Sequence, residues 1–316
     1  MVDSQHMRAM GRVVRDYMYF VGELSPRFDG SMLSKLVNWR AFLRISALFD
    51  RQAELCRPLF AARRQSRSKV RGGMVHPYVD SLLDLRVADG VVRRALRESE
   101  MVGLVFEFLG AGTGTIAACV EWTLAHLINQ PEIQARLRRE IHDETTPGAM
   151  LSSKSLRGMP YLNAVERARA KEILVGATAM PPDGLRVLFN LGDIGRDKAT
   201  WTDPDEFRPE RFLAGGEGED VGPLPVPKEI RMMPFGAGHR HCPGVGMGMM
   251  LIKCFLAKLV GEFEWAPAAQ DCSGGVDVTE LNGFLKLMKK PLSGRFLLPK
   301  SFTSGDMAFS SGRKGL

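Results

Sequence analysis

One short stretch, residues 234–244, restricts what this chain can fold into more than any other part of it. It brings together three glycines, an arginine and a single cysteine, and it runs directly into an apolar helical pattern at residues 245–263. Glycine permits positive φ and close approach of the backbone to a ligand, and Pro243 suits the first turn of a helix. The pattern predicts that Cys242 lies on a loop at a helix N-terminus, where free N–H groups and the helix dipole favour an anionic sulfur.

Three interpretations of Cys242 are open at this point. A thiolate held in this way is a suitable ligand for iron. A free buried thiol after a glycine turn is the second interpretation, and it is a common environment for a lone cysteine. A zinc site formed by His239, His241 and Cys242 is the third, but no paired Cys-x-x-Cys or His-x-x-x-His motif completes its ligand set.

The loop resembles Phe-x-x-Gly-x-Arg-x-Cys-x-Gly, the haem-binding signature of the cytochromes P-450, which are haem-thiolate monooxygenases. Every fixed position is filled, by Phe235, Gly238, Arg240, Cys242 and Gly244. The resemblance implies that Cys242 is the axial ligand of a haem b iron and that Phe235 packs beside its sulfur. It also implies that Arg240 meets a haem propionate and that Gly244 lets the helix approach the porphyrin. Five coincident positions favour the iron ligand over the other two interpretations.

A second feature is the apolar helical pattern at residues 98–129, which corresponds to roughly 45 Å of helix. Residues 101–120 are apolar over about the thickness of a bilayer, so a transmembrane helix is one interpretation. Glu107 near the centre of the stretch, together with its glycines and threonines, favours a core helix of a globular domain.

The same helix resembles the distal helix of the cytochromes P-450, with its pattern Ala/Gly-Gly-x-Asp/Glu-Thr-Thr/Ser. Ala111, Gly112 and Thr115 match this pattern. The resemblance implies that Ala111 and Gly112 lie over the haem and that Thr115 is the catalytic hydroxyl that serves O2. The position of the family's acid is occupied by Gly114, and that of its last hydroxyl by Ile116. The departure predicts a poor proton supply at Thr115, because no neighbouring carboxylate remains.

A third resemblance lies between the helical patterns at residues 98–129 and 245–263. Glu166 and Arg169 satisfy the family's Glu-x-x-Arg motif, one helical turn apart, and Arg211 lies in a run that matches the family closely. The resemblance implies that Glu166, Arg169 and Arg211 form a buried network that fixes the meander at residues 214–227 behind the haem. The apolar residues and prolines that usually surround the motif are absent, so an accidental surface pair of little energetic value is the alternative.

Charge and cysteine content narrow the possible partners and the compartment. The net charge is +7, and its densest cluster lies at residues 63–71. An anionic membrane surface or a nucleic acid could bind such a cluster. A solvated loop at residues 61–78 is favoured, and no nucleic-acid partner is expected, because no aromatic interleaving or binding module accompanies the charges. Five widely spaced cysteines favour reduced thiols facing the cytosol.

The resemblance implies a mainly α fold with small β-sheets (α+β), the C-terminal part of a cytochrome P-450. We expect a single partial domain over residues 1–298 and a polar tail at residues 299–316. Within the domain we expect helices and the basic loop at 7–95, the distal and following helices at 96–144, the Glu-x-x-Arg region, a hairpin and the meander at 156–232, and the ligand loop and helix at 233–263.

The runs at residues 131–134 and 208–212 are most similar to plant microsomal members of the family. Residues 1–12 contain no apolar segment of a secretory signal. Because eukaryotic members usually begin with a membrane-anchoring helix, the resemblance implies a truncated N-terminus. It implies residence on the cytosolic face of the endoplasmic reticulum through the absent anchor, and a soluble cytoplasmic protein if the chain is expressed as written.

Two functions follow from these observations. The first is a monooxygenase that inserts one oxygen atom from O2 into a small apolar organic substrate, with electrons from an NADPH-cytochrome reductase. The second is a truncated, catalytically inactive remnant that binds haem weakly or not at all. The intact Cys242 loop supports the first, and Gly114 with the interrupted Glu-x-x-Arg region supports the second.

Overall fold

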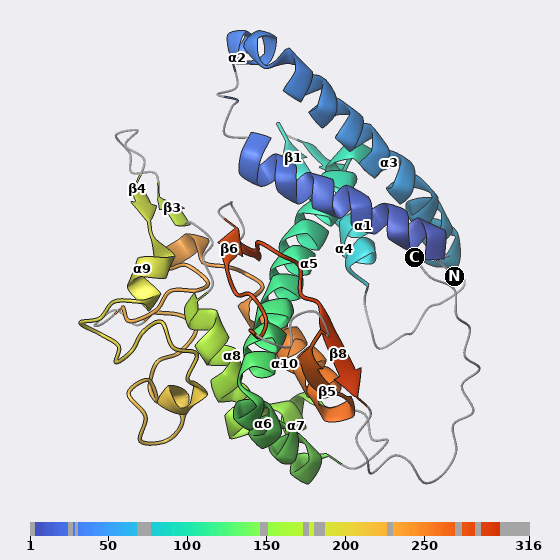
Figure 1. The fold of residues 1–316 in the computed structure, drawn as a ribbon. Coiled ribbons are helices and arrows are strands. Elements are labelled where there is room, and N and C mark those ends of the chain that lie inside the picture. Colours follow the sequence, from blue (N-terminus) through green and yellow to red (C-terminus); the bar gives the residue numbers. More distant parts are fainter. Residues whose placement is uncertain are drawn as a thin grey trace. The chain divides into compact units, whose positions relative to one another are not determined.

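The computed structural model of the 316-residue chain divides into two compact units, one formed mainly by residues 1–117 and the other by residues from 118 onward. It is mostly helical with small two-stranded sheets, which confirms the predicted fold class (Figure 1). The single partial domain over residues 1–298 stays a prediction. The structure describes residues 4–24, 28, 31–67, 77–90, 92–145, 151–172, 177–179, 187–225, 230–268, 274–281 and 286–297.

The first unit is built on two helices, α1 (Ser4–Tyr19) and α3 (Trp39–Arg67), which pack alongside each other (Figure 1). A π-helix at Phe20–Leu24 extends α1, and the short helix α2 (Met32–Val37) precedes α3. Val13 and Val14 give α1 a buried apolar face. The core of the unit consists of Val13, Val14, Leu48, Cys56, Phe60, Leu82, Met101, Val102 and Phe106.

Helix α3 continues through Pro58 to Arg67, so the prediction of a loop from residue 61 is wrong. Three ion pairs hold the end of α3 to helix α4 (Tyr78–Asp84): Arg63–Asp80, Arg67–Asp80 and Arg67–Asp84. Arg63 donates two hydrogen bonds, of 2.8 and 2.6 Å, to the buried carboxylate of Asp80. Arg67 donates to Asp84 at 2.5 Å. These carboxylates neutralise part of the basic cluster, which is therefore partly structural.

An antiparallel hairpin of β1 (Arg86–Asp89) and β2 (Val92–Ala95) follows α4. The sequence predicted only helices and a loop over residues 7–95, so this hairpin corrects that prediction. Its strands are mostly exposed and carry several charged side chains. Such strands lack the regular alternation of apolar and polar residues that reveals a half-buried strand.

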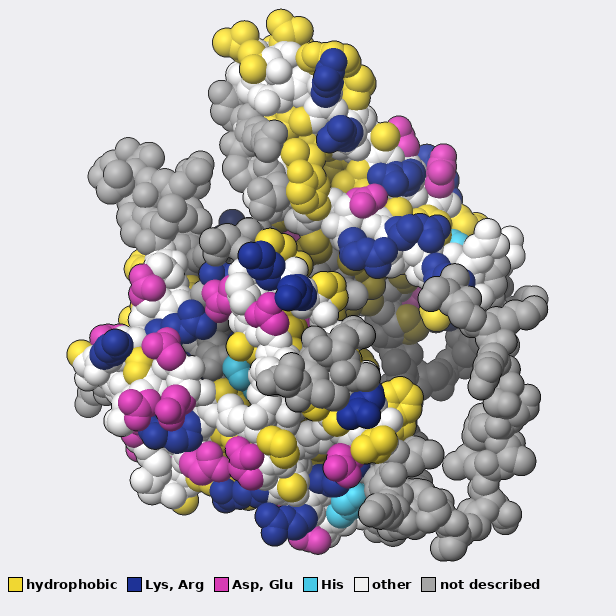
Figure 2. Space-filling model, in the orientation of Figure 1, with side chains coloured by type: hydrophobic (Ala, Val, Ile, Leu, Met, Phe, Trp, Pro, Cys, Tyr) yellow, Lys and Arg dark blue, Asp and Glu magenta, His cyan; other side chains and the backbone are white. Residues whose placement is uncertain are grey.

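Large apolar side chains remain exposed on α2 and at the start of α3. Figure 2 shows them as a yellow band over these two helices. The most exposed are Met32, Leu33, Leu36, Val37, Trp39 and Leu43. An exposed apolar patch of this kind favours association with another surface.

Helix α5 (Glu98–Asn129) has the bounds that the sequence predicted. Among the described residues it is the one helix long and apolar enough to cross a membrane, judged by length and composition. Met101 and Phe106 are buried in the core of the first unit, and Trp122 and Ile128 in that of the second. This burial agrees with the core helix that the sequence favours.

The second unit contains the C-terminal part of α5 together with four helices that pack against one another: α6 (Pro131–Glu144), α7 (Ser153–Arg157), α8 (Pro160–Glu172) and α10 (Val245–Glu262). The buried residues Ile133, Leu137 and Ile141 form the apolar face of α6. The short helix α9 (Leu191–Gly195) and two 3-10 turns, Pro209–Phe212 and Gly238–Arg240, follow α8 in the sequence.

Three antiparallel strand pairs complete the second unit. Strand β3 (Ala177–Ala179) pairs with β4 (Val187–Phe189), which confirms the strands of the predicted hairpin; the turn predicted at residues 181–184 lies outside the described residues. The other pairs are β5 (Glu264–Pro267) with β8 (Gly294–Leu297), and β6 (Glu280–Leu281) with β7 (Leu287–Met288). The polar tail predicted at residues 299–316 also lies outside the described residues.

Candidate cofactor site

The loop that carries Cys242 is closed by its own backbone. The N–H of Cys242 donates a 2.8 Å hydrogen bond to the carbonyl of Phe235, across the glycines of the loop. Gly236 and Gly238 adopt positive φ values of 72° and 68°, a region that glycine enters without a steric penalty. The loop therefore requires glycine at both positions in order to fold back on itself.

The sulfur of Cys242 lies next to the start of α10. Gly244 is the N-cap of this helix, and a Cβ atom placed on Gly244 would lie 3.7 Å from the Cys242 Sγ atom. Gly244 accepts a 2.7 Å hydrogen bond from the N–H of Gly248, so the helix begins directly after the loop. The first N–H groups of the helix and the positive end of its dipole thus lie near the sulfur.

The donor set of the loop fits a thiolate-bound haem. Cys242 is a free, half-buried thiol, so its sulfur can reach a ligand. A Cβ atom on Gly238, Gly246 or Gly248 would meet nothing within 4 Å, which leaves open space beside the loop. The guanidinium of Arg240 is exposed on the same loop, and none of the ion pairs in the described part of the chain involves it. It is therefore free to bind an anionic group such as a propionate.

A zinc centre is a poorer fit. The structure describes His239, His241 and Cys242, yet no group of three His, Cys, Asp or Glu side chains within its described residues could hold a metal ion. The ring Nδ1 of His241 instead lies 2.8 Å from the carbonyl of Gly238 within the loop. One protein sulfur with open space beside it suits an iron whose other ligands come from a porphyrin.

The matched residues of the distal helix lie near the middle of α5. Thr115 Oγ1 donates a 2.6 Å hydrogen bond to the carbonyl of Ala111, and α5 is a continuous α-helix through these residues. A Cβ atom on Gly112 would meet nothing within 4 Å. Ala111, Gly112 and Thr115 belong to the first unit, whereas the Cys242 loop belongs to the second.

Glu166 and Arg169 are both buried in α8, with 2% and 4% of their surfaces exposed. The structure does not join them in the expected ion pair. The carboxylate of Glu166 lies 3.5 Å from the Lys253 Nζ atom of α10, and the guanidinium of Arg169 packs 4.7 Å from the centre of the Trp122 ring. Lys253 thus occupies the place at Glu166 that the sequence motif assigned to Arg169.

Burial raises the pKa of Glu166 to about 8, although Lys253 and Arg167 act in the opposite direction. One carboxylate oxygen, Oε1, has no hydrogen-bond partner in the described structure. A carboxyl group with a raised pKa and an unpaired oxygen is expected to hold a proton near neutral pH.

Arg211 is 2% exposed and anchors the residues that lead into the predicted meander. It donates to backbone carbonyls and to one carboxylate; none of the described ion pairs links it to Glu166. Its acceptors are the carbonyls of Thr202, Asp203 and Glu206 and the side chain of Glu217. Arg211 thus holds residues 202–217 together. Its predicted link to Glu166 and Arg169 stays a prediction.

Two further side chains hold α8 in place, and the sequence patterns did not indicate them. Glu140 of α6 accepts 2.7 Å hydrogen bonds from the backbone N–H groups of Tyr161 and Leu162, at the start of α8. Lys171, near its end, donates to the carbonyls of Gly195 and Pro204 at 2.8 and 2.6 Å. Such contacts join residues far apart in the sequence, so periodicity carries no signal for them.

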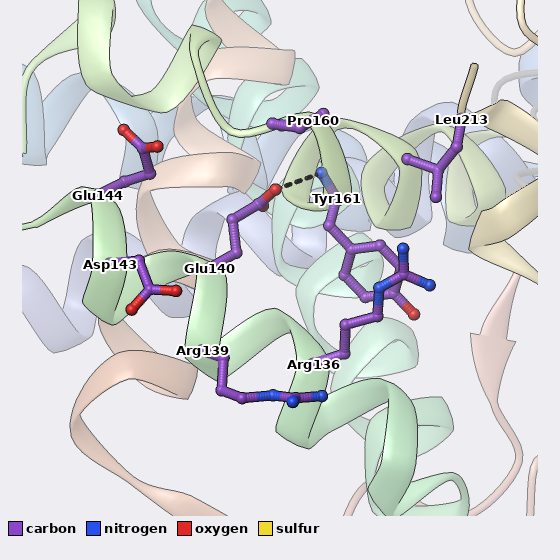
Figure 3. Close-up of a pocket in the computed structure, with 8 residues that line it drawn as sticks. All are labelled: Arg136, Arg139, Glu140, Asp143, Glu144, Pro160, Tyr161 and Leu213. Atoms are coloured by element: carbon purple, nitrogen blue, oxygen red, sulfur yellow. Dashed lines mark hydrogen bonds between the residues drawn. The ribbon is translucent and has the colours of Figure 1, made fainter.

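A groove of about 440 Å³ lies between α6 and α8 (Figure 3). Two of its lining side chains, Arg136 and Tyr161, contact each other and a glutamate outside the lining: Arg136 donates to Glu210 at 3.0 Å and lies 4.1 Å from the centre of the Tyr161 ring. The hydroxyl of Tyr161 also donates to Glu210, at 2.8 Å. No residue of the Cys242 loop lines the groove.

Comparison with known proteins identifies the family of the chain. A family model described as Cytochrome P450 matches residues 26–293. The chain belongs to the cytochrome P450 family. The family's cofactor is haem, and Phe235, Gly238, Arg240, Cys242 and Gly244 fill its signature.

Plant cytochromes P450 are among the most similar relatives, which confirms the resemblance to plant members. Cytochrome P450 89A9 of Arabidopsis thaliana is 34% identical over 250 residues, covering 71% of this chain and 48% of that protein. The flavonoid 3'-monooxygenase CYP75B137 of Crocosmia x crocosmiiflora is 32% identical over 227 residues, covering 67% and 44%. The chain therefore spans about half the length of the curated relatives that it matches.

A solved structure shares the fold. The haem domain of cytochrome P450DA superimposes with a TM-score of 0.65 over 93% of this chain and 61% of that one. The two sequences are 16% identical in this alignment, so the match supports the fold and not a shared substrate.

Proposed function

We propose that the chain is the haem-binding part of a haem-thiolate monooxygenase, with Cys242 as the axial ligand of a haem b iron. The observation that carries this proposal is the Cys242 loop, in which a free half-buried sulfur lies beside the start of α10. When bound, the haem supplies the activation of O2 and the transfer of one oxygen atom to an apolar organic substrate.

The residues of the chain hold the cofactor and control protons around it. The N-terminal turn of α10 stabilises the Cys242 thiolate, and Gly244 keeps side-chain atoms away from the sulfur. Arg240 binds a propionate, a charge-assisted contact that fixes the porphyrin. Phe235 shields the sulfur from water on the loop side.

Ala111 and Gly112 provide a small-residue surface for the distal face of the cofactor, and Thr115 provides its hydroxyl. In the structure this hydroxyl donates to Ala111 within the helix, and it must turn away to serve as a donor elsewhere. Because Gly114 offers no carboxylate beside it, proton delivery is the weak step of the proposed reaction.

We propose an NADPH-cytochrome reductase as the electron donor and a small apolar molecule as the substrate. We also propose that the whole protein works on the cytosolic face of the endoplasmic reticulum. Kinship with plant members supports these assignments, and relatives such as the flavonoid 3'-monooxygenase indicate the size of molecule to test first.

A second candidate is a chain that binds haem weakly and catalyses nothing. Two observations favour it. Gly114 replaces the acid of the distal motif, and Glu166 pairs with Lys253 instead of Arg169. The first removes a proton donor, and the second changes the buried network behind the ligand.

Haem loading of the purified chain separates the two candidates. The apo protein is titrated with haem, and the reduced, carbon-monoxide-treated product is examined for the long-wavelength absorption band of a thiolate ligand. One haem per chain with this band supports the monooxygenase. Weak, non-saturating binding, or a spectrum without the band, rejects it in favour of the inactive chain.

A further inference from the structure

The buried contact between α8 and α10 involves a lysine whose burial needs an explanation. Lys253 is 9% exposed, and its partners lie on the other helix. Its Nζ atom donates a 2.8 Å hydrogen bond to the Oδ1 atom of Asn163 and lies 3.5 Å from Glu166. Among the described residues, these are the two polar partners of the ammonium group.

Asn163 is itself held rigidly. Its Nδ2 atom donates to the carbonyls of Arg157 and Met159, at 3.1 and 2.7 Å. These bonds leave Oδ1 as the atom that faces Lys253, which fixes the orientation of the amide. Because Glu140 caps the start of α8, the acceptor of Lys253 is tied through α8 to α6.

Stability alone does not account for this arrangement. Replacing a buried ion pair by apolar side chains of similar volume is often neutral or stabilising, and the neighbours of Lys253 on α10, Ile252 and Leu256, are buried apolar residues. A methionine would fill the same space without burying an ammonium group. What a directional hydrogen bond adds is a fixed rotation and register of α10 against α8.

The rotation of α10 determines where the sulfur of Cys242 points. Lys253 lies about two turns into the helix, roughly 12 Å along its axis from Val245, and Cys242 precedes Val245 by three residues. We propose that Lys253 and Asn163 form a positioning clamp that holds the start of α10, and with it Cys242, in the orientation that haem ligation requires. This inference rests on the proposed function of Cys242.

Three variants test the clamp, each measured by haem titration, by the carbon-monoxide spectrum and by urea unfolding of the apo protein. Lys253→Met removes the donor and keeps the length of the side chain. Asn163→Leu removes the acceptor. The matched control is Lys258→Met, on the exposed side of α10, where the side chain is 64% exposed and pairs with Glu262.

We expect Lys253→Met and Asn163→Leu each to lower the thiolate-ligated fraction of bound haem several-fold. The double variant should lose no more than either single variant, because both remove one contact. Each single variant leaves a buried polar partner behind and should lower the urea midpoint of the apo protein. The double variant makes both partners apolar, so its urea midpoint should lie near that of the wild type, and Lys258→Met should match the wild type in every measurement. Lys253→Gln, which keeps a donor, should recover part of the thiolate fraction.

Several results would overturn the clamp. An unchanged thiolate fraction in Lys253→Met would do so while leaving the role of Cys242 intact. A loss of that fraction in the double variant in step with an equal loss of its apo stability would show a merely structural role. A wild-type protein without the thiolate band would reject the proposed function and the clamp together.

Discussion

Replacing Glu166 by glutamine should flatten the pH dependence of stability. The folded chain holds the proton of Glu166 up to a pKa of about 8, whereas the ordinary value is 4.5. Between these values the folded state binds a proton that the unfolded state releases, so the free energy of unfolding falls as pH rises. The contribution of Glu166 is fully present below pH 4.5 and is lost as pH rises through about 8.

The size of the effect follows from the shift. One pKa unit corresponds to 1.36 kcal/mol, so the shift of Glu166 sets a ceiling of roughly 5 kcal/mol. Relaxation and water entry around the carboxylate reduce this value, and we expect about 2–3 kcal/mol. Glutamine cannot ionise and has nearly the same shape, so the Glu166→Gln variant should lose this part of the pH dependence.

The assay is equilibrium urea unfolding of the apo protein between about pH 5 and pH 9. The control is Glu132→Gln, which removes an exposed carboxylate from α6. Stability of the wild type and the control should fall across this range by a larger amount than that of Glu166→Gln. Equal slopes for all three proteins would refute the reasoning, because Glu166 would then titrate alike in both states.

Two other substitutions give direct tests. Gly114→Asp should restore a proton donor beside Thr115 and raise the amount of product formed per NADPH consumed. If product is detectable and this ratio is unchanged, protons arrive by another route. Gln52→Met should raise the free energy of unfolding by about 1–3 kcal/mol, because Gln52 is fully buried and neither its Nε2 nor its Oε1 atom has a partner in the described structure. A lower stability in urea unfolding would show that the amide has a partner that the protein requires.

The sequence predicted the parts of the fold that local patterns determine. The helix at residues 98–129 was found with its bounds because its apolar run ends at Pro131, which starts the next helix. The Cys242 loop could be predicted from the sequence, because its glycines and proline in this order are typical of few other structures. The positive φ values of Gly236 and Gly238 agree with that prediction.

Other features depend on tertiary contacts that a local pattern does not contain. Proline normally interrupts a helix, yet α3 continues through Pro58, with Cys56 and Phe60 buried in the core on either side of it. The partner of Glu166 could not be predicted, because Lys253 belongs to another helix far along the chain. The motif offered Arg169 at helical spacing, and burial against Trp122 gives that arginine a different contact.

One spectrum tests whether the sulfur of Cys242 binds the haem iron. Cys242→Ser is compared with Cys254→Ser, which removes a free cysteine from α10 outside the loop. Both variants and the wild type are loaded with haem, reduced and treated with carbon monoxide. We expect the long-wavelength thiolate band in the wild type and in Cys254→Ser, and its loss in Cys242→Ser. A band that survives in Cys242→Ser would contradict the assignment of Cys242 as the ligand.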